Sequence, residues 1–121
     1  MDIFNPVHFK IETLTNIIGS DPKVLVNLLE EIVKGSERIF EQLNANFESE
    51  SWKSLKNNAH FLKSNFRYLG NTDMMNLLKN IELFASDDVK RTEIPKLIQE
   101  FNASFPSIIN EVKEYLQQLK G

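Results

Sequence analysis

Apolar residues recur along this chain at spacings of three and four, which is the pattern of amphipathic helices. The pattern predicts a short first helix over residues 6–18. It predicts a long second helix that starts at residues 20–22, where an N-cap acceptor precedes a proline, and that runs to about Asn46. Residues 35–36 place a glycine inside that helix at a cost on the order of 1 kcal/mol, and close packing against another helix is the simplest explanation.

Three further helices are predicted, over residues 51–70, over residues 71–85 and from about Thr92 to the end of the chain. Pro106 lies inside the apolar repeat of the last helix, so a kink or break is expected between Asn102 and Phe105. No alternating strand pattern occurs. The sequence therefore predicts an all-α fold, a four-helix bundle (antiparallel, up-down) with a short N-terminal lid helix, in a single domain over residues 1–121.

Composition narrows the possible functions. Hydrophobic residues make up 41% and charged residues 26% of the 121 residues, as in an ordinary globular domain. A net charge of −3 without basic runs argues against nucleic acid as a partner, and the absence of long apolar runs argues against a membrane. The chain has no cysteine and its two histidines lie far apart, so no metal site and no cofactor are predicted, and a cytoplasmic location is expected.

The third predicted helix carries one histidine away from its apolar face. At roughly 100° per residue, its core positions lie between roughly 180° and 260° from His60. Lys56, Lys63, Ser64 and Arg67 all fall within roughly 60° of it. We therefore expect His60 to be exposed among cationic side chains. His8 lies beside a proline in the poorly patterned first segment, and we expect no role for it.

This arrangement has two chemical consequences. Three neighbouring cations would disfavour a further positive charge and so keep the ring of His60 neutral and nucleophilic near neutral pH. If the ring accepted a phosphoryl group, Lys63 and Arg67 could offset its negative charge, and Ser64 could donate its hydroxyl.

Phe61 and Tyr68 would flank the same face with apolar area suited to a docking partner. Geometry alone also fits an interpretation in which none of these residues has a function. Most exposed histidines and lysines on a helix are simply solvated, and aromatic residues at these angles more often belong to the edge of the core.

Residues 58–70 resemble the core motif of histidine-containing phosphotransfer domains. That family has Ala-His-x-Leu-Lys-Gly, then Leu-Gly at the end of the helix and Leu-Glu in the next helix. This chain has Ala-His-Phe-Leu-Lys-Ser at residues 59–64, Leu-Gly at residues 69–70 and Ile-Glu at residues 81–82. The order of the predicted helices also matches. The clear departure is Ser64 in place of the glycine, which leaves partner choice open.

The resemblance implies a phosphocarrier that is not an enzyme in its own right. His60 would accept a phosphoryl group from the aspartate of a response-regulator receiver domain, or donate one to it, and Lys63 would stabilise that group. The docking and supporting residues would be Ser64, Arg67, Lys56, Phe61 and Tyr68. A hybrid sensor histidine kinase is a second expected kind of partner, and the chain is expected to be a monomer.

Two alternatives stand beside this hypothesis. The bundle could dock a receiver or kinase domain without taking phosphate, and Ser64 is the best support for that interpretation. A hydrolase or transferase with its own active site has little support, because no Gly-rich phosphate loop occurs and the acidic residues are scattered over polar faces.

Overall fold

The computed structural model describes residues 8–121, and every element in that part of the chain is helical. The predicted all-α fold is confirmed. No helix in this part of the chain combines the length and the apolarity that crossing a bilayer requires. The elements are α1 (Ile11–Ile18), α2 (Pro22–Glu48), α3 (Trp52–Tyr68), α4 (Thr72–Ala85), the short 3₁₀ helix η1 (Lys90–Glu93) and α5 (Ile94–Lys120).

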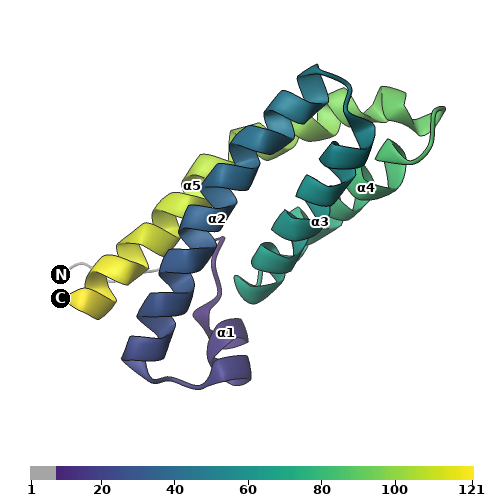
Figure 1. The fold of residues 1–121 in the computed structure, drawn as a ribbon. Helices are drawn as coiled ribbons and strands as arrows, with labels where there is room; N and C mark the ends of the chain where they lie inside the picture. Colours follow the sequence, from purple (N-terminus) through teal and green to yellow (C-terminus); the bar gives the residue numbers. More distant parts are fainter. Residues whose placement is uncertain (1–7) are drawn as a thin grey trace.

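The four long helices pack as a bundle in which each contacts two others. α2 lies against α3 and α5, and α4 lies against the same two helices. Figure 1 shows α2 and α5 side by side along the length of the molecule, with the α3–α4 hairpin next to them and the chain direction alternating from one long helix to the next. α3, which carries His60, therefore has α2 on one side and α4 on the other.

The core consists of the apolar stripes that the sequence pattern predicts. All five predicted core residues of α3 are completely buried, and aromatic rings from three helices meet beneath them. Phe66 of α3 packs edge-on against Phe101 of α5, with ring centroids 5.9 Å apart. Phe40 of α2 stacks on Phe105 of α5 at 4.1 Å. These contacts hold the buried face of α3 toward α2 and α5.

Of the kink or break expected between Asn102 and Phe105, the break does not occur, because α5 continues through Pro106. The proline ring lies on the exposed side of the helix, whereas Phe105, Ile108 and Ile109 beside it are buried. Burial of these neighbours holds both halves of the helix against the bundle, which offsets the loss of one backbone hydrogen bond.

Both connections of α3 use the same backbone turn. After α3, the amides of Gly70 and Asn71 donate to the carbonyls of Arg67 and Phe66, which is a Schellman motif with Gly70 at φ 69°. Before α3, the turn that ends α2 has the same pair of bonds, but Glu50 occupies the left-handed position at φ 56°. A side chain is strained in this position, so Glu50 costs stability.

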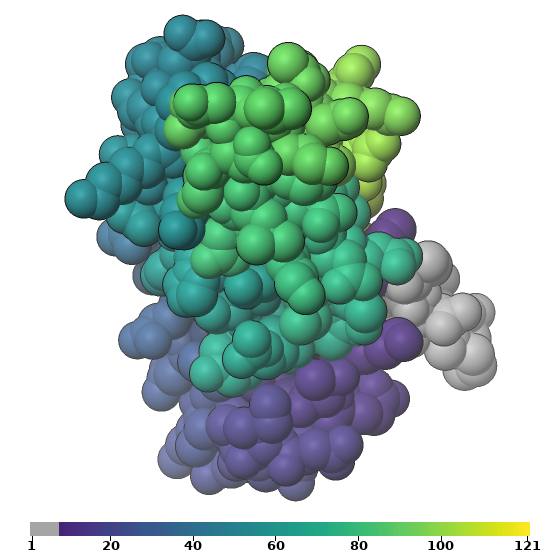
Figure 2. Space-filling model, turned by 90° about the vertical axis from the view of Figure 1, so that its right-hand side faces the viewer, coloured from purple at the N-terminus to yellow at the C-terminus, as the bar shows by residue number. Residues whose placement is uncertain are grey.

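Residues 8–18 form an N-terminal lid over the end of the α3–α4 hairpin, as Figure 2 shows in purple. The amide of Lys10 donates to the carbonyl of Leu69, and the side chain of Asn71 donates to the carbonyl of His8. A Cβ on Gly70 would lie 2.5 Å from the hydroxyl of Thr13. Gly70 is therefore required twice, for its backbone angle and for the close approach of the lid.

The lid differs from its prediction in two respects. Residues 1–7 lie outside the described part of the chain, and residues 8–10 are not helical, so the described helix begins at Ile11 instead of residue 6. His8 makes a structural contact that the sequence pattern did not predict, because its backbone amide and its ring both contact the carboxylate of Glu111 on α5. Phe9 is buried beside them, edge-on to Tyr115.

The two turns predict opposite effects of substitution. Glu50→Gly should raise the free energy of unfolding by about 1 kcal/mol, because glycine adopts the left-handed conformation without strain. Gly70→Ala should lower it by more than about 1 kcal/mol, because it adds both backbone strain and a clash with the lid. Denaturant midpoints measure both effects. As a control, Glu48→Gly lies within α2 and should be destabilising, and a destabilising Glu50→Gly would refute the strain argument.

Candidate functional site

The buried stripe of α3 sets the direction in which His60 points. Ala59 and Leu62 on either side of it are fully buried, whereas the His60 side chain is 63% exposed. The centre of the buried stripe lies roughly 140° from His60 around α3, so burial of the stripe turns the imidazole toward solvent. The predicted exposure of His60 is confirmed.

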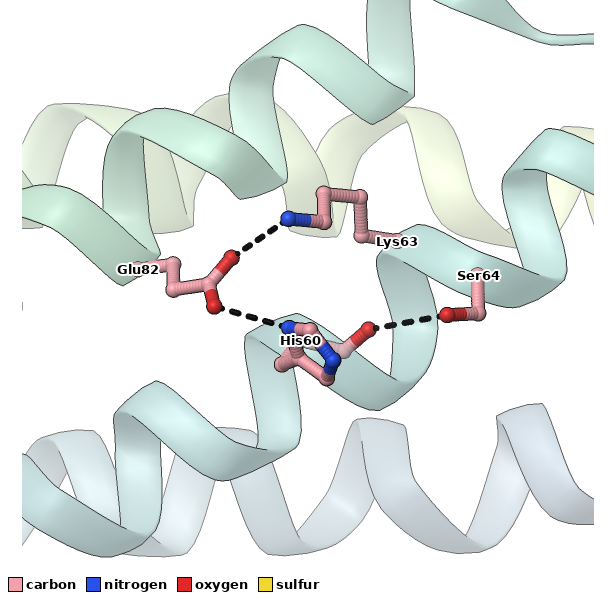
Figure 3. Close-up of polar contacts among 4 residues, drawn as sticks. All are labelled: His60, Lys63, Ser64 and Glu82. Atoms are coloured by element: carbon pink, nitrogen blue, oxygen red, sulfur yellow. Dashed lines mark hydrogen bonds and ion pairs between the residues drawn. The ribbon is translucent and has the colours of Figure 1, made fainter.

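A carboxylate from α4 bridges His60 and Lys63. One oxygen of Glu82 lies 2.8 Å from Nδ1 of His60, and the other accepts a hydrogen bond from Nζ of Lys63 at 2.7 Å. Figure 3 shows the side chains of His60 and Lys63 on α3 both pointing to Glu82, which belongs to the neighbouring helix α4. The three residues form one charged cluster, the His60–Lys63–Glu82 cluster, at the boundary between α3 and α4.

Glu82 was not predicted as a site residue, although the sequence contains a signal for it. His60 lies eleven residues before Asn71, and Glu82 lies eleven residues after it. In an antiparallel hairpin that turns at Asn71, residues at equal distances from the turn lie at the same level along the two helices. The hairpin prediction therefore already placed Glu82 level with His60.

The cluster keeps Glu82 ionised although its side chain is only 17% exposed. Burial by itself would raise the pKa of this carboxyl. The hydrogen bonds from Lys63 and His60, together with the positive potential around these two side chains, outweigh burial and hold the pKa below the ordinary value for glutamate. A carboxylate is thus maintained beside the imidazole.

The carboxylate also determines which ring nitrogen is available for chemistry. An ionised carboxylate can only accept a hydrogen bond, so Nδ1 of His60 carries the proton and donates it to Glu82. In the neutral ring, the lone pair then belongs to Nε2. Nε2 has no hydrogen-bond partner among residues 8–121, and it lies on the side of the ring away from Glu82 (Figure 3). The site therefore presents one basic, accessible nitrogen to solvent.

The other polar residues predicted around His60 are distributed differently from the expectation. Lys63 is only 20% exposed and points to Glu82, and the nearest charge to the ring is this carboxylate instead of a cation. Lys56 and Arg67 are exposed, and neither forms an ion pair with any residue between 8 and 121. Ser64 turns its hydroxyl back to the carbonyl oxygen of His60, at a long 3.5 Å, so it does not contact the imidazole (Figure 3).

Two aromatic side chains lie beside the exposed face. Phe61 is 40% exposed and Tyr68 is 37% exposed, whereas Leu55, Leu62 and Phe66 of the same helix are completely buried. Asn65, by contrast, is buried and donates a hydrogen bond to Ser36 of α2 at 2.8 Å, although its angle had placed it outside the core stripe. In the described part of the chain, no three acidic or histidine side chains gather as a metal site would require.

The comparison with protein families identifies the domain. The family model of the Hpt domain matches residues 27–121, which is most of the chain. The chain belongs to the Hpt domain family. Membership implies a part in histidine phosphotransfer within two-component signalling. The lid and the first turn of α2 lie outside the matched residues of this Hpt domain, and no curated protein or solved structure shows a significant match to the chain.

The Hpt domain should lose the contribution of Glu82 to stability at low pH. Because the pKa of Glu82 is lower in the folded protein than in the unfolded chain, the unfolded chain binds more protons at pH values between the two. The contribution is therefore complete above the pKa of the unfolded chain and disappears as the pH falls through the pKa of the folded protein. We expect Glu82→Gln to be less stable than wild type at about pH 7, and the difference to shrink toward about pH 3.

Urea unfolding of both proteins across this pH range measures the effect. Glu114→Gln is the matched control, because it removes the same charge from an exposed position on α5. A difference between wild type and Glu82→Gln that stayed constant with pH would show that the carboxylate charge is not what stabilises the cluster.

Proposed function

We propose that this Hpt domain is a phosphocarrier in a two-component phosphorelay, with Nε2 of His60 as the phosphoryl acceptor. Nε2 would take the group from the aspartyl phosphate of a response-regulator receiver domain and pass it to the aspartate of another. The observation that carries the proposal is the bond between Nδ1 and Glu82, which leaves Nε2 as the exposed nucleophile.

The transfer can be followed atom by atom. The lone pair of Nε2 attacks phosphorus, the bond from phosphorus to the aspartate oxygen breaks, and the aspartate leaves as a carboxylate. The proton on Nδ1 stays in place, so the ring gains positive charge as the new bond forms. Glu82 lies 2.8 Å from that nitrogen and offsets this charge. The reverse transfer uses the same contacts in the opposite order.

Lys63 is proposed to stabilise the phosphoryl group. Its hydrogen bond to Glu82 in the unphosphorylated protein indicates how it does so. Its ammonium group is bonded to Glu82, one turn of α3 from His60. When the ring of His60 becomes positively charged, Glu82 has two cationic neighbours and a weaker hold on each. A phosphoryl group on Nε2 then offers Lys63 a second anionic partner close by. Lys63 would thus move its hydrogen bond from the carboxylate of Glu82 to the phosphoryl group.

The exposed cations outside the His60–Lys63–Glu82 cluster are proposed to attract the partner. A receiver domain would supply the metal ion and acidic pocket for the reaction, which is why this chain is proposed as a carrier and not as an enzyme. Lys56 and Arg67, exposed on either side of His60, would attract an acidic surface of that kind. Ser64, whose side chain folds back onto α3, leaves the space above the imidazole open.

His60→Gln should abolish phosphorylation without changing the fold. An exposed polar residue on a helix contributes little packing, so the melting temperature should change by only a few degrees. The measurement is label on this chain after incubation with phosphorylated receiver domains. In the wild type the label should be lost in acid and kept in alkali, as expected for a phosphorus–nitrogen bond.

Three outcomes would contradict the assignment. Label on His60→Gln would move the acceptor elsewhere, and acid-stable label would indicate a hydroxyl group. A wild-type chain that bound receiver domains but took no label from any of them would favour the alternative, an interaction module that docks without accepting phosphate.

Lys63→Ala should slow phosphorylation of His60 by about tenfold, because one partly buried cation is lost from the anionic transition state. Lys113→Ala is the matched control. It also removes a lysine that is paired with a glutamate on a neighbouring helix, at 3.0 Å from Glu37, but in an exposed position on α5. Single-turnover rates with one phosphorylated receiver domain compare the two variants. Equal rates would remove Lys63 from the proposed chemistry.

A further inference from the structure

The aromatic ring next to His60 rests on a helix that lacks a side chain at that point. Phe61 directly follows His60 and lies roughly 100° further around α3, on the side of α2. A Cβ on Gly35 of α2 would be 3.4 Å from Cζ of Phe61 and 3.6 Å from Cε1. The tip of the ring therefore lies over the bare backbone of α2, while 40% of the residue remains exposed.

The backbone of α2 does not itself require glycine at this position. Gly19 and Gly70 have positive φ angles after the ends of helices, whereas Gly35 lies in the middle of α2 without one. Glycine in a helix interior costs about 1 kcal/mol relative to alanine. The structural feature associated with this glycine is its contact with Phe61, whose ring atoms would lie next to a Cβ at residue 35.

Two polar contacts hold the ring over Gly35. Asn65 of α3 donates to Ser36 of α2 at 2.8 Å, and Asn46 of α2 donates to Asn58 of α3 at 2.6 Å. Along α3 these contacts lie on either side of Phe61. They fix the position of α2 relative to α3, so the ring and its support are in place before any partner binds.

A protein that reaches His60 must also cover Phe61. A specific interface of ordinary size buries about 800 Å² on each partner, far more than one imidazole exposes. Binding energy in such interfaces is concentrated in a few rigid aromatic or cationic anchors. Phe61 is large, partly exposed and supported by the backbone of α2, so it meets this description better than the exposed cations Lys56 and Arg67.

We infer that Phe61, supported by Gly35, is the apolar anchor for the receiver domain, and that Gly35 is a positioning residue that determines which receivers fit. The inference rests on the proposed function and adds the chemistry of the partner surface. That surface presents an apolar side chain to Phe61 beside the acidic pocket that meets His60 and Lys56. A larger side chain at residue 35 displaces the ring of Phe61 from the position in which it meets the partner.

The test separates binding from transfer. Gly35→Leu and Phe61→Ala should each raise the KM for a phosphorylated receiver domain about tenfold and leave the maximal transfer rate within about twofold of wild type. The Kd for the same receiver without phosphate should rise by a similar factor. In the Phe61→Ala background, Gly35→Leu should add little, because no ring remains to be displaced. Ala103→Leu, which adds a side chain to an exposed position on α5, should have no effect.

Each result bears on a different claim. Unchanged KM and Kd in Gly35→Leu and Phe61→Ala, with normal transfer to His60, would overturn the anchor and leave the phosphocarrier intact. Fully additive effects in the double variant would refute the action of Gly35 through Phe61. A wild-type chain that accepts no phosphoryl group from any receiver would refute the proposed function itself. Circular dichroism and thermal melting establish that the variants are folded.

Discussion

Burial of a single apolar stripe on α3 is the constraint on which the rest of the site depends. Leu62 and Phe66 can be buried only if α3 has one rotation about its axis, and that rotation carries His60 to the surface. If the buried stripe were shifted by one position along the sequence, α3 would have to rotate by roughly 100° about its axis, and His60 would no longer reach α4. The core thus controls the site through geometry, although no buried residue of the stripe takes part in the chemistry.

The charge at the site is more balanced than the local sequence implies. Lys56, Lys63 and Arg67 make the exposed face of α3 look cationic, but a partly buried carboxylate from α4 lies closest to the ring. Glu82 both orders the imidazole and engages Lys63, and its lowered pKa follows from those same contacts. The site therefore has two kinds of cation, one held within the cluster and two exposed to the surroundings.

The helices, the core faces and the exposure of His60 could be predicted because periodicity reports the angle of each residue around its own helix. Contacts between helices depend on how far one helix is displaced along another, and periodicity does not contain that information. Glu82 was missed for this reason, although the turn at Asn71 supplied the displacement for this one hairpin. Asn65 lies at an intermediate angle, where only the position of α2 decides burial. Pro106 shows that packing can override a local rule.

The part-buried side-chain amides between α2 and α5 have a consequence for the uniqueness of the fold. Apolar stripes pack almost as well when one helix slides by a turn, so a core of leucine and phenylalanine alone tolerates several alignments. Asn44 and Asn102 each donate to and accept from the other, at 3.1 and 2.7 Å, and both are satisfied in only one alignment of α2 with α5. A shift would break both hydrogen bonds and leave two part-buried amides without these partners. These residues select a single register among near-equivalent ones, as polar positions do in coiled coils.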